Sequence, residues 1–410
     1  MSIVQHLSPI GIRRSAASAA GSIVVDGTAL DTGHRERGLG RLVSGLLSGF
    51  AELSAEHRLD LPLATLRLRS SARERADGQS VAGRAGDLSV LESWTLARPR
   101  GHLTRWFLNE LLLPSELEGC RLYHATDPWA LPISTHFATV ATVADVIPLL
   151  FPEHYLNRKH MNWRIYYAAL RRADRWNKCT HIIAISQAAK ATISEYLGVP
   201  GEKITVVYPG IDHGQFRTPA AETIARVRDR YGLERPFFLY LGGYDYRKNI
   251  ATLIRAFANM RRSDVELVLA GGMTPRQRVD LEGVARRAAA PVRFLGYVDD
   301  DAVPALYALA VAFCYPSLAE GFGLQVLESM AMGCPVVAAN SSCLPEVVGD
   351  AGLLADVHDA DDFASALRRI LDDSTLRQDL VARGREHVKQ FSWRRCAEET
   401  LAIYRTFRAS

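Results

Sequence analysis

The sequence predicts an α/β protein of two doubly wound domains, each built on a parallel sheet. The first observation is the length of 410 residues, which suits two hydrophobic cores better than one. The second is a repeated alternation of short apolar runs with longer amphipathic runs, typical of buried parallel strands joined by helices. The third is that no segment of about 20–50 residues repeats, so the chain is not a repeat array.

The amino-terminal half opens with an apolar run at 22–26 that predicts a buried strand. Residues 39–53 follow with apolar side chains at helical spacing. Further short apolar runs, each ending in polar residues, predict strands at 121–124, 138–145 and 181–186. This order of strand, helix and strand indicates a parallel sheet.

The carboxyl-terminal half repeats the same order more regularly. Strand-like runs lie at 237–243, 266–272, 292–296, 310–316 and 335–339. A helical pattern follows most of them, which again predicts a doubly wound sheet. The chain ends in a helical pattern at 392–407, and periodicity leaves open which domain this last helix packs on.

The domain boundary is predicted at the turn-rich segment Tyr208-Pro209-Gly210-Ile211-Asp212. Residues 21–207 then form the first domain and residues 208–391 the second. Residues 1–20 are interpreted as a loose extension. Ligands of doubly wound sheets bind beyond the carboxyl ends of the strands, so we expect the site in the cleft between the domains.

Composition excludes several classes of protein. Hydrophobic residues make up 48% and charged residues 23%, as in a soluble globular protein, and no apolar run reaches the roughly 18 residues of a spanning helix. The net charge of +4 is too small for a nucleic-acid partner. The six cysteines form no C-x-x-C pair, which favours small core residues in a reducing cytoplasm.

The strongest candidate site is the segment 320–328 (EGFGLQVLE), which follows a predicted strand and runs into a helix. Gly321 and Gly323 leave backbone N–H groups open to a ligand, and a helix amino end attracts anions. The segment therefore predicts a seat for a diphosphate, with Glu320 near a sugar and Glu328 near a ribose. The alternative is a capped helix with two solvated glutamates.

A second candidate site is the segment 242–249 (GGYDYRKN), after the first strand of the carboxyl-terminal half. Gly243 frees the backbone there, and the adjacent cations Arg247 and Lys248 suit an anion. Taken alone, this is equally an ordinary charged loop. Both segments follow strands of one predicted sheet, so they can converge on a single diphosphate.

Taken together, these residues resemble the retaining glycosyltransferases of family 4, which have the GT-B fold. The resemblance covers most of residues 22–405 and is densest in the pair Glu320 and Glu328 and in the loop 247–249. The segments 332–338 (MGCPVVA) and 344–347 (LPEV) add to it. So many matches in order are specific, although each alone is weak.

The resemblance implies a role for each matching residue. Arg247 and Lys248 neutralise the departing diphosphate, Glu320 orients the donor hexose, and Glu328 holds the ribose. The implied donor-binding residues are Gly38, Gly40, Arg41, Gly243, Tyr297, Val298, Gly321, Phe322, Gly323, Leu324 and Glu328. Among them, Gly38, Gly40 and Arg41 match the glycine-rich loop of the acceptor domain. The final helix, residues 392–410, is expected to cross back onto that domain.

A catalytic histidine is less well defined. Many members of the family carry one at the end of the strand that here reads Tyr123-His124-Ala125-Thr126. His124 matches that position, but Thr126 is an alternative match. His124 is therefore either catalytic or a buried residue at the end of a strand.

The resemblance implies retention of anomeric configuration, with the leaving phosphate oxygen taking the acceptor proton. Catalysis then rests on charge stabilisation and positioning, and we expect neither a cofactor nor a metal. The run Asp299-Asp300-Asp301 invites a metal-binding interpretation, but it precedes a helical pattern. We interpret it as a helix cap.

Two basic and aromatic segments bear on where the protein works. Residues 98–113 combine arginines with Trp106 and Phe107, and a second cluster contains Arg171, Arg172, Arg175, Trp176 and Lys178. Such segments are either core helices with solvated charges or amphipathic surfaces for an anionic membrane. A cytoplasmic protein with peripheral membrane contact is consistent with the second interpretation.

The main hypothesis is a retaining hexosyltransferase that uses a nucleotide-diphosphate sugar and a glycan or polyprenyl-linked glycan acceptor. GDP-mannose is the favoured donor, because the loop 247–249 and the segment 38–41 resemble bacterial mannosyltransferases of polysaccharide biosynthesis. One alternative is a nucleotide-sugar epimerase on the same fold, which needs acid and base groups on both walls of the cleft. Another is a non-catalytic partner that keeps the fold without turnover.

Overall fold

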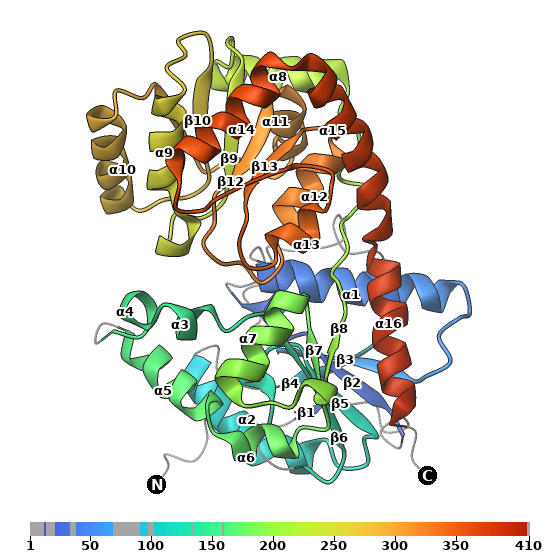
Figure 1. The fold of residues 1–410 in the computed structure, drawn as a ribbon. Helices are drawn as coiled ribbons and strands as arrows, with labels where there is room; N and C mark the ends of the chain where they lie inside the picture. The colour runs from blue at the N-terminus through green and yellow to red at the C-terminus, as the bar shows by residue number, and fades with distance from the viewer. Residues whose placement is uncertain are drawn as a thin grey trace, which may run out of the picture. The chain divides into compact units, whose positions relative to one another are not determined.

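The chain folds into two compact units. The computed structural model describes residues 12–13, 21–32, 38–68, 91–96, 102–132, 135–157 and 160–407. One unit comprises Met1–Gly210 with Trp393–Ser410, and the other comprises Ile211–Ser392. The division after Gly210 lies three residues from the predicted boundary, and the carboxyl-terminal segment groups with the first unit (Figure 1).

The first unit is built on an eight-stranded sheet in the order β1-β4-β3-β2-β5-β6-β7-β8. Neighbouring strands are parallel except β1 and β4, which pair antiparallel. The strands are β1 (Ile12–Arg13), β2 (Ile23–Asp26), β3 (Leu63–Leu68), β4 (Glu92–Leu96), β5 (Leu122–Ala125), β6 (Ala138–Val143), β7 (His181–Ala184) and β8 (Ile204–Val206). The predicted loose extension at 1–20 contains β1, which pairs with β4. The rest of that segment lies outside the described residues.

Helices cover both faces of this sheet. Val24 of β2 packs into one core, whereas its neighbours Ile23 and Val25 pack into another, as the alternation of side chains along a strand requires. Helices α1 (Gly38–Ala55) and α16 (Trp393–Thr406) supply the second of these cores. The other helices of the unit are α2 (His102–Glu116), α3 (Ile147–Leu150), α4 (Pro152–Tyr155), α5 (Met161–Leu170), α6 (Ala173–Lys178) and α7 (Gln187–Leu197).

Glycines in α1 let the carboxyl-terminal helix approach closely. A Cβ atom on Gly45 would lie 2.0 Å from the ring of Trp393, and one on Gly49 would lie 2.2 Å from the backbone oxygen of Trp393. No side chain larger than hydrogen fits either position without displacing α16. Figure 1 shows α16, in red, crossing α1, in blue, and this packing ties the end of the chain to the first unit.

The second unit is built on a six-stranded, fully parallel sheet in the order β11-β10-β9-β12-β13-β14. The strands are β9 (Phe237–Leu241), β10 (Glu266–Ala270), β11 (Val292–Gly296), β12 (Ala312–Tyr315), β13 (Val336–Ala339) and β14 (Leu353–Ala355). The first five are the five predicted strands: β11 has the predicted bounds, and the other four are shorter than predicted by one to three residues. The central strands β12 and β13 are buried at every residue, as expected for a sheet covered on both faces.

The helices of the second unit alternate with these strands. They are α8 (Ala221–Tyr231), α9 (Ile250–Asn259), α10 (Pro275–Arg287), α11 (Val303–Leu309), α12 (Leu324–Ala331), α13 (Leu344–Val348), α14 (Ala360–Asp372) and α15 (Ser374–His387). The prediction that Asp299–Asp301 cap a helix is wrong. The residue before α11 is Ala302, no side chain caps that helix, and Asp299 instead pairs with Arg230 at 2.8 Å.

Each sheet has one point where the strand order reverses. In the second unit the chain moves outward from β9 through β10 to β11, and then returns to place β12 on the other side of β9. In the first unit the same reversal separates β2 from β5. The loops that leave two such strands diverge and open a crevice at the carboxyl ends, where doubly wound sheets bind ligands.

Candidate functional site

The reversal between β9 and β12 brings the two predicted segments of the second unit together. The loop after β9 carries Arg247 and Lys248, and the loop after β12 carries Glu320. The backbone N–H of Leu318 donates to the backbone oxygen of Arg247 at 2.7 Å. Nη1 of Arg247 in turn donates to the backbone oxygen of Ala319 at 3.0 Å. The two loops therefore form one continuous surface.

Asn249 fixes the end of the loop that carries the cations. Its backbone is left-handed, with φ of 55°, a conformation that asparagine tolerates better than most residues. Its Nδ2 donates to the backbone oxygen of Val357 at 2.8 Å, and its Oδ1 accepts from Thr252 Oγ1 at 2.8 Å. These bonds set the start of α9 and so the direction in which Arg247 and Lys248 project.

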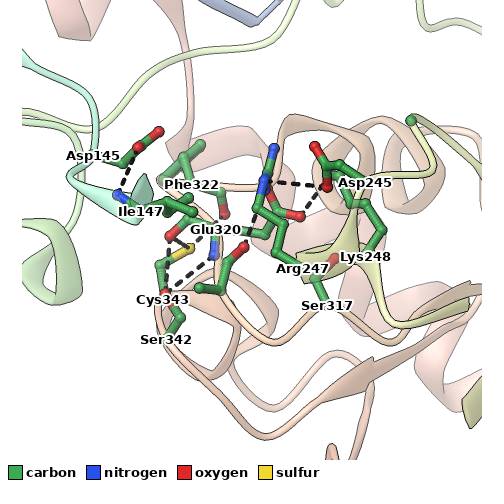
Figure 2. Close-up of polar contacts among 12 residues, drawn as sticks. Asp145, Ile147, Asp245, Arg247, Lys248, Ser317, Glu320, Phe322, Ser342 and Cys343 are labelled. Atoms are coloured by element: carbon green, nitrogen blue, oxygen red, sulfur yellow. Dashed lines mark hydrogen bonds and ion pairs between the residues drawn. The ribbon is translucent and has the colours of Figure 1, made fainter. Parts of the chain in front are cut away.

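Glu320 binds both cations at once (Figure 2). Its Oε2 pairs with Nη1 of Arg247, and its Oε1 pairs with Nζ of Lys248 at 2.6 Å. Nζ of Lys248 also donates to Tyr315 Oη at 2.9 Å. Lys248 is 5% exposed and Glu320 8%, whereas the side chain of Arg247 is 21% exposed. Arg247 is therefore the more accessible of the two cations.

This arrangement keeps the carboxyl group of Glu320 ionised. Burial raises the pKa of Glu320, but the charges of Arg247 and Lys248 outweigh it and lower the pKa to about 2. Burial lowers the pKa of Lys248, an effect that the charge of Glu320 opposes. At neutral pH the carboxyl group of Glu320 is therefore ionised and held between Arg247 and Lys248.

The loop that carries Glu320 is held from a third strand. Ser342, after β13, donates from Oγ to the backbone oxygen of Glu320 at 2.9 Å and accepts from the backbone N–H of Glu320 at 3.3 Å. Sγ of Cys343 donates to the backbone oxygens of Glu320 at 3.3 Å and of Phe322 at 3.0 Å. Figure 2 shows these contacts around the loop. Ser342, Cys343 and Tyr315 are site residues that the sequence interpretation missed.

The glycine-rich turn leads directly into α12. Gly323 precedes the helix with φ of 98°, a conformation that residues other than glycine rarely adopt. No side-chain hydrogen bond caps this end of the helix. Its amino end therefore presents backbone N–H groups and a partial positive charge beside Glu320, which suits a diphosphate. Gly321, Phe322 and Leu324 lie in this turn, as predicted.

The remaining predicted donor residues of the second unit lie in three different environments. Glu328 is 2% exposed within α12, and Oη of Tyr307 donates to it at 3.4 Å. Tyr297 is 66% exposed just after β11, whereas the neighbouring Val298 is buried. Gly243 lies in the loop after β9, and its backbone oxygen accepts from Oη of Tyr240. All four follow or face the carboxyl ends of the strands.

In the first unit, the predicted glycine-rich loop is not a loop. Gly38, Gly40 and Arg41 form the first turn of α1, with Gly38 as the first residue of the helix. No acidic side chain lies in that turn, so the described residues of the helix do not themselves offset its partial positive charge. These residues offer an anion a helix amino end. Residues 33–37, which precede them, lie outside the described part of the chain.

His124 is fully buried in β5 and both ring nitrogens have partners. Nδ1 lies 2.6 Å from Oη of Tyr404, on α16, and Nε2 lies 2.8 Å from Oγ1 of Thr142, on β6. Burial lowers the pKa of His124 to about 3, so the ring is neutral. The geometry favours the buried strand-end interpretation over the catalytic one, because no face of the ring is open to a substrate.

Part of the second basic cluster is also structural. Arg175 is 4% exposed, pairs with Glu110 on α2 and donates to the backbone oxygen of Leu131 at 2.5 Å. Trp176 is 1% exposed and donates from Nε1 to the backbone oxygen of Leu170 at 2.6 Å. Of the two alternatives left open for this cluster, these two buried side chains fit the core helix and not the membrane surface. All six cysteines are free and buried, as expected of small core residues.

Comparison with known proteins now decides the family. Residues 38–215 match the model of glycosyltransferase family 4, and residues 224–387 match that of glycosyl transferases group 1. The chain is 33% identical to O-antigen chain mannosyltransferase B of Escherichia coli, over 65% of this chain and 70% of the relative. The protein belongs to the family 4 glycosyltransferases.

Two further relatives are mannosyltransferases by name. This glycosyltransferase is 32% identical to phosphatidyl-myo-inositol mannosyltransferase of Mycolicibacterium smegmatis, over 67% of this chain and 69% of the relative. It is also 32% identical to the serotype-specific mannosyltransferase WbdA of Escherichia coli, over 62% of this chain. It spans only about a third of the length of WbdA, 32% of that protein.

Solved structures place the glycosyltransferase in the GT-B fold. HepE of Anabaena in complex with UDP and glucose aligns with a TM-score of 0.70 at 18% identity, covering 94% of this chain and all of that one. A glycosyltransferase of Rickettsia africae aligns with a TM-score of 0.68 at 15% identity, covering 95% of this chain and 98% of that one. At these identities the likeness shows the fold alone.

The buried carboxylate gives a prediction for stability. Replacing Glu320 by Gln leaves two cations without their partner and should lower the free energy of unfolding at neutral pH by roughly 3 kcal/mol. Glu282→Gln is the control, because Glu282 pairs with Arg278 on the surface of α10, where loss of an ion pair costs about 1 kcal/mol or less. Urea denaturation followed by circular dichroism measures both.

The stability difference between the wild type and Glu320→Gln should also depend on pH. The pKa of Glu320 is lowered from 4.5 to about 2, so its stabilisation is complete above 4.5 and is lost as the pH falls through about 2. The difference in the free energy of unfolding between the wild type and Glu320→Gln should therefore shrink as the pH falls from 4.5 to about 2. A difference that is small at pH 7, or that stays constant down to pH 2, contradicts the assigned environment.

Proposed function

We propose that this glycosyltransferase transfers mannose from GDP-mannose to a glycan or polyprenyl-linked glycan, with retention of anomeric configuration. The observation that carries the proposal is the cluster of Arg247, Lys248 and Glu320 beside the amino end of α12. In this cluster the two cations are suited to bind a diphosphate, and the carboxylate is suited to bind the hydroxyl groups of a sugar. The names of its relatives in Escherichia coli and Mycolicibacterium smegmatis support mannose as the sugar.

The proposed chemistry needs the site to favour charge on the leaving group. As the bond to the sugar breaks, negative charge develops on the diphosphate, and Arg247 and Lys248 stabilise it together with the helix amino end. Glu320 is held ionised and oriented, so its oxygens are suited to accept hydrogen bonds from hexose hydroxyls. We propose that these two cations supply the charge stabilisation for which other transferases use a metal ion.

Retention requires that the acceptor proton goes to a group on the leaving-group side of the sugar. His124 is buried and neutral, so it is not suited to take that proton. We propose instead that an oxygen of the departing phosphate accepts it. In this scheme the protein contributes positioning and electrostatic stabilisation, and no side chain acts as a covalent nucleophile.

The donor and the site are tested together by following GDP release from GDP-mannose by mass spectrometry. Arg247→Ala should lower kcat/KM by about a hundredfold or more, because charge stabilisation of the leaving group is lost. Arg276→Ala is the control, since Arg276 is a surface residue of α10 with an 88% exposed side chain. Turnover should persist in EDTA, and NMR of the product should show the α-anomer of mannose.

Other outcomes of this experiment have distinct meanings. If the protein turns over only UDP- or dTDP-sugars, the proposal of GDP-mannose as the donor is contradicted, whereas the proposed donor site is kept. A near-normal kcat/KM in Arg247→Ala contradicts the proposal that Arg247 stabilises the leaving diphosphate. Nucleotide binding without turnover on any acceptor favours the non-catalytic alternative, and conversion of the donor sugar without an acceptor favours the epimerase.

We also propose that the first unit contacts a membrane surface from the cytoplasm. Five large apolar side chains of α2 and α5 are between 44% and 60% exposed: Phe107, Leu111, Met161, Trp163 and Ile165. The exposed cations Arg164, Arg171, Arg172 and Lys178 lie on or after α5. The two helices meet where the rings of Trp106 and Tyr166 pack edge to face, with their centroids 6.4 Å apart. Apolar groups flanked by cations suit anionic headgroups.

This contact would be peripheral. Within the part of the chain that the structure describes, no helix is both long and apolar enough to cross a bilayer. Binding then depends on the exposed apolar side chains and on attraction between the cations and anionic lipid. Each exposed side chain that is removed should weaken it, and salt should weaken it as well.

Sedimentation with vesicles tests the membrane proposal. The protein should sediment with phosphatidylglycerol vesicles at low salt and stay in solution with phosphatidylcholine vesicles. The double variant Phe107→Ser/Trp163→Ser should lose most of this binding, whereas Val279→Ser should keep it, because Val279 is a 66% exposed residue of α10 in the other unit. Recovery of the wild type in the supernatant with both lipids contradicts the proposal.

A further inference from the structure

The second unit contains a groove at the amino ends of its strands, whereas Glu320 lies beyond their carboxyl ends. Its volume is about 590 Å³, within the range of roughly 300–1,000 Å³ that is typical of small-molecule sites. Phe237, Val311 and Pro335 line it. These residues begin β9 or immediately precede β12 and β13, whereas Glu320 and Ser342 follow the other ends of β12 and β13.

Both basic and apolar residues line the groove. Arg228, Arg235 and Arg377 line it, and Glu234 is the one carboxylate among the lining residues. The guanidinium of Arg385 lies close to Gly333, another lining residue, with Nη2 at 2.7 Å from the position a Cβ would occupy. The remaining lining residues are mostly apolar: Leu233, Pro236, Phe237, Leu309, Ala310, Val311, Pro335 and Val381.

One of these arginines has a structural role at the end of a helix, but this role does not account for all of them. Nη1 of Arg377 donates to the backbone oxygens of Ile370 and Leu371 at the end of α14, which is an ordinary stabilising contact for a cation. Arg228 and Arg235, in contrast, each make one long ion pair at 3.5 Å, with Asp229 and Glu266. A guanidinium has five N–H donors, so both keep donors for a ligand.

We propose that this groove binds a phosphate monoester of a small organic group, as a second site separate from the one that holds the sugar donor. Arg228 and Arg235 bind the phosphate, since a guanidinium matches phosphate oxygens in a bidentate way. The apolar lining residues, Val311 among them, receive the organic part. A volume of about 590 Å³ exceeds what a phosphate alone would fill.

The same strands connect the two sites. β9 and β12 run from the groove to the loops that hold Arg247 and Glu320. A ligand in the groove therefore contacts the elements that position the donor-binding cluster. Binding itself is the proposal, and it does not depend on which sugar donor the enzyme uses.

Calorimetric titration with glucose 6-phosphate and with farnesyl phosphate tests the proposal, with glucose as the neutral control. Saturable binding of either ester to the wild type, with none of glucose, is the expected result, and the ester that binds distinguishes a soluble from a lipid-linked source. Arg228→Ala/Arg235→Ala should weaken that binding roughly tenfold or more, because charged hydrogen bonds are lost. Both side chains are about half exposed, at 50% and 44%, so the variant should fold normally.

Two controls separate the groove from the donor site. Arg276→Ala, on the surface of α10, should bind the ester as the wild type does. Arg247→Ala, at the donor site, should also bind it unchanged. The proposal is overturned if the wild type binds neither ester, or if the groove variant binds as tightly as the wild type. It is equally overturned if Arg247→Ala abolishes binding, because the ester then occupies the donor site.

Discussion

The candidate site of the second unit depends on one buried carboxylate between two cations. Glu320 joins the loop after β12 to the loop after β9 through Arg247 and Lys248, across the point where the strand order reverses. A reversal of this kind separates the two loops, and here backbone hydrogen bonds and the ion pairs of Glu320 together join them. The ion pairs also gather two cations at the carboxyl ends of the strands, which is the charge that the proposed diphosphate donor requires.

The sequence was most informative where strands are buried on both faces. The five predicted strands of the second unit are all present, because near-continuous apolar runs such as that of β12 have few other interpretations. The edge strand β1 and the short β14 were missed, because two or three residues carry no periodicity, and β3 and β4 of the first unit were missed as well. In the candidate site, glycines and charges next to strand ends predicted that Arg247, Lys248 and Glu320 converge, and the structure brings these three side chains together.

Other parts of the site depend on contacts distant in sequence. Ser342 and Cys343 hold the Glu320 loop from β13, and no local pattern in the chain indicates that pairing. His124 is held by Tyr404, which lies 280 residues later. That distance explains why the sequence left both a catalytic and a structural role open for His124.

The most direct test of the central claim is a crystal structure of the protein with GDP bound. The account predicts the diphosphate within hydrogen-bonding distance of Arg247 and at the amino end of α12, with Glu320 still paired to Lys248. A diphosphate bound elsewhere, with the Arg247–Glu320 pair unchanged and the α12 end unoccupied, would contradict it.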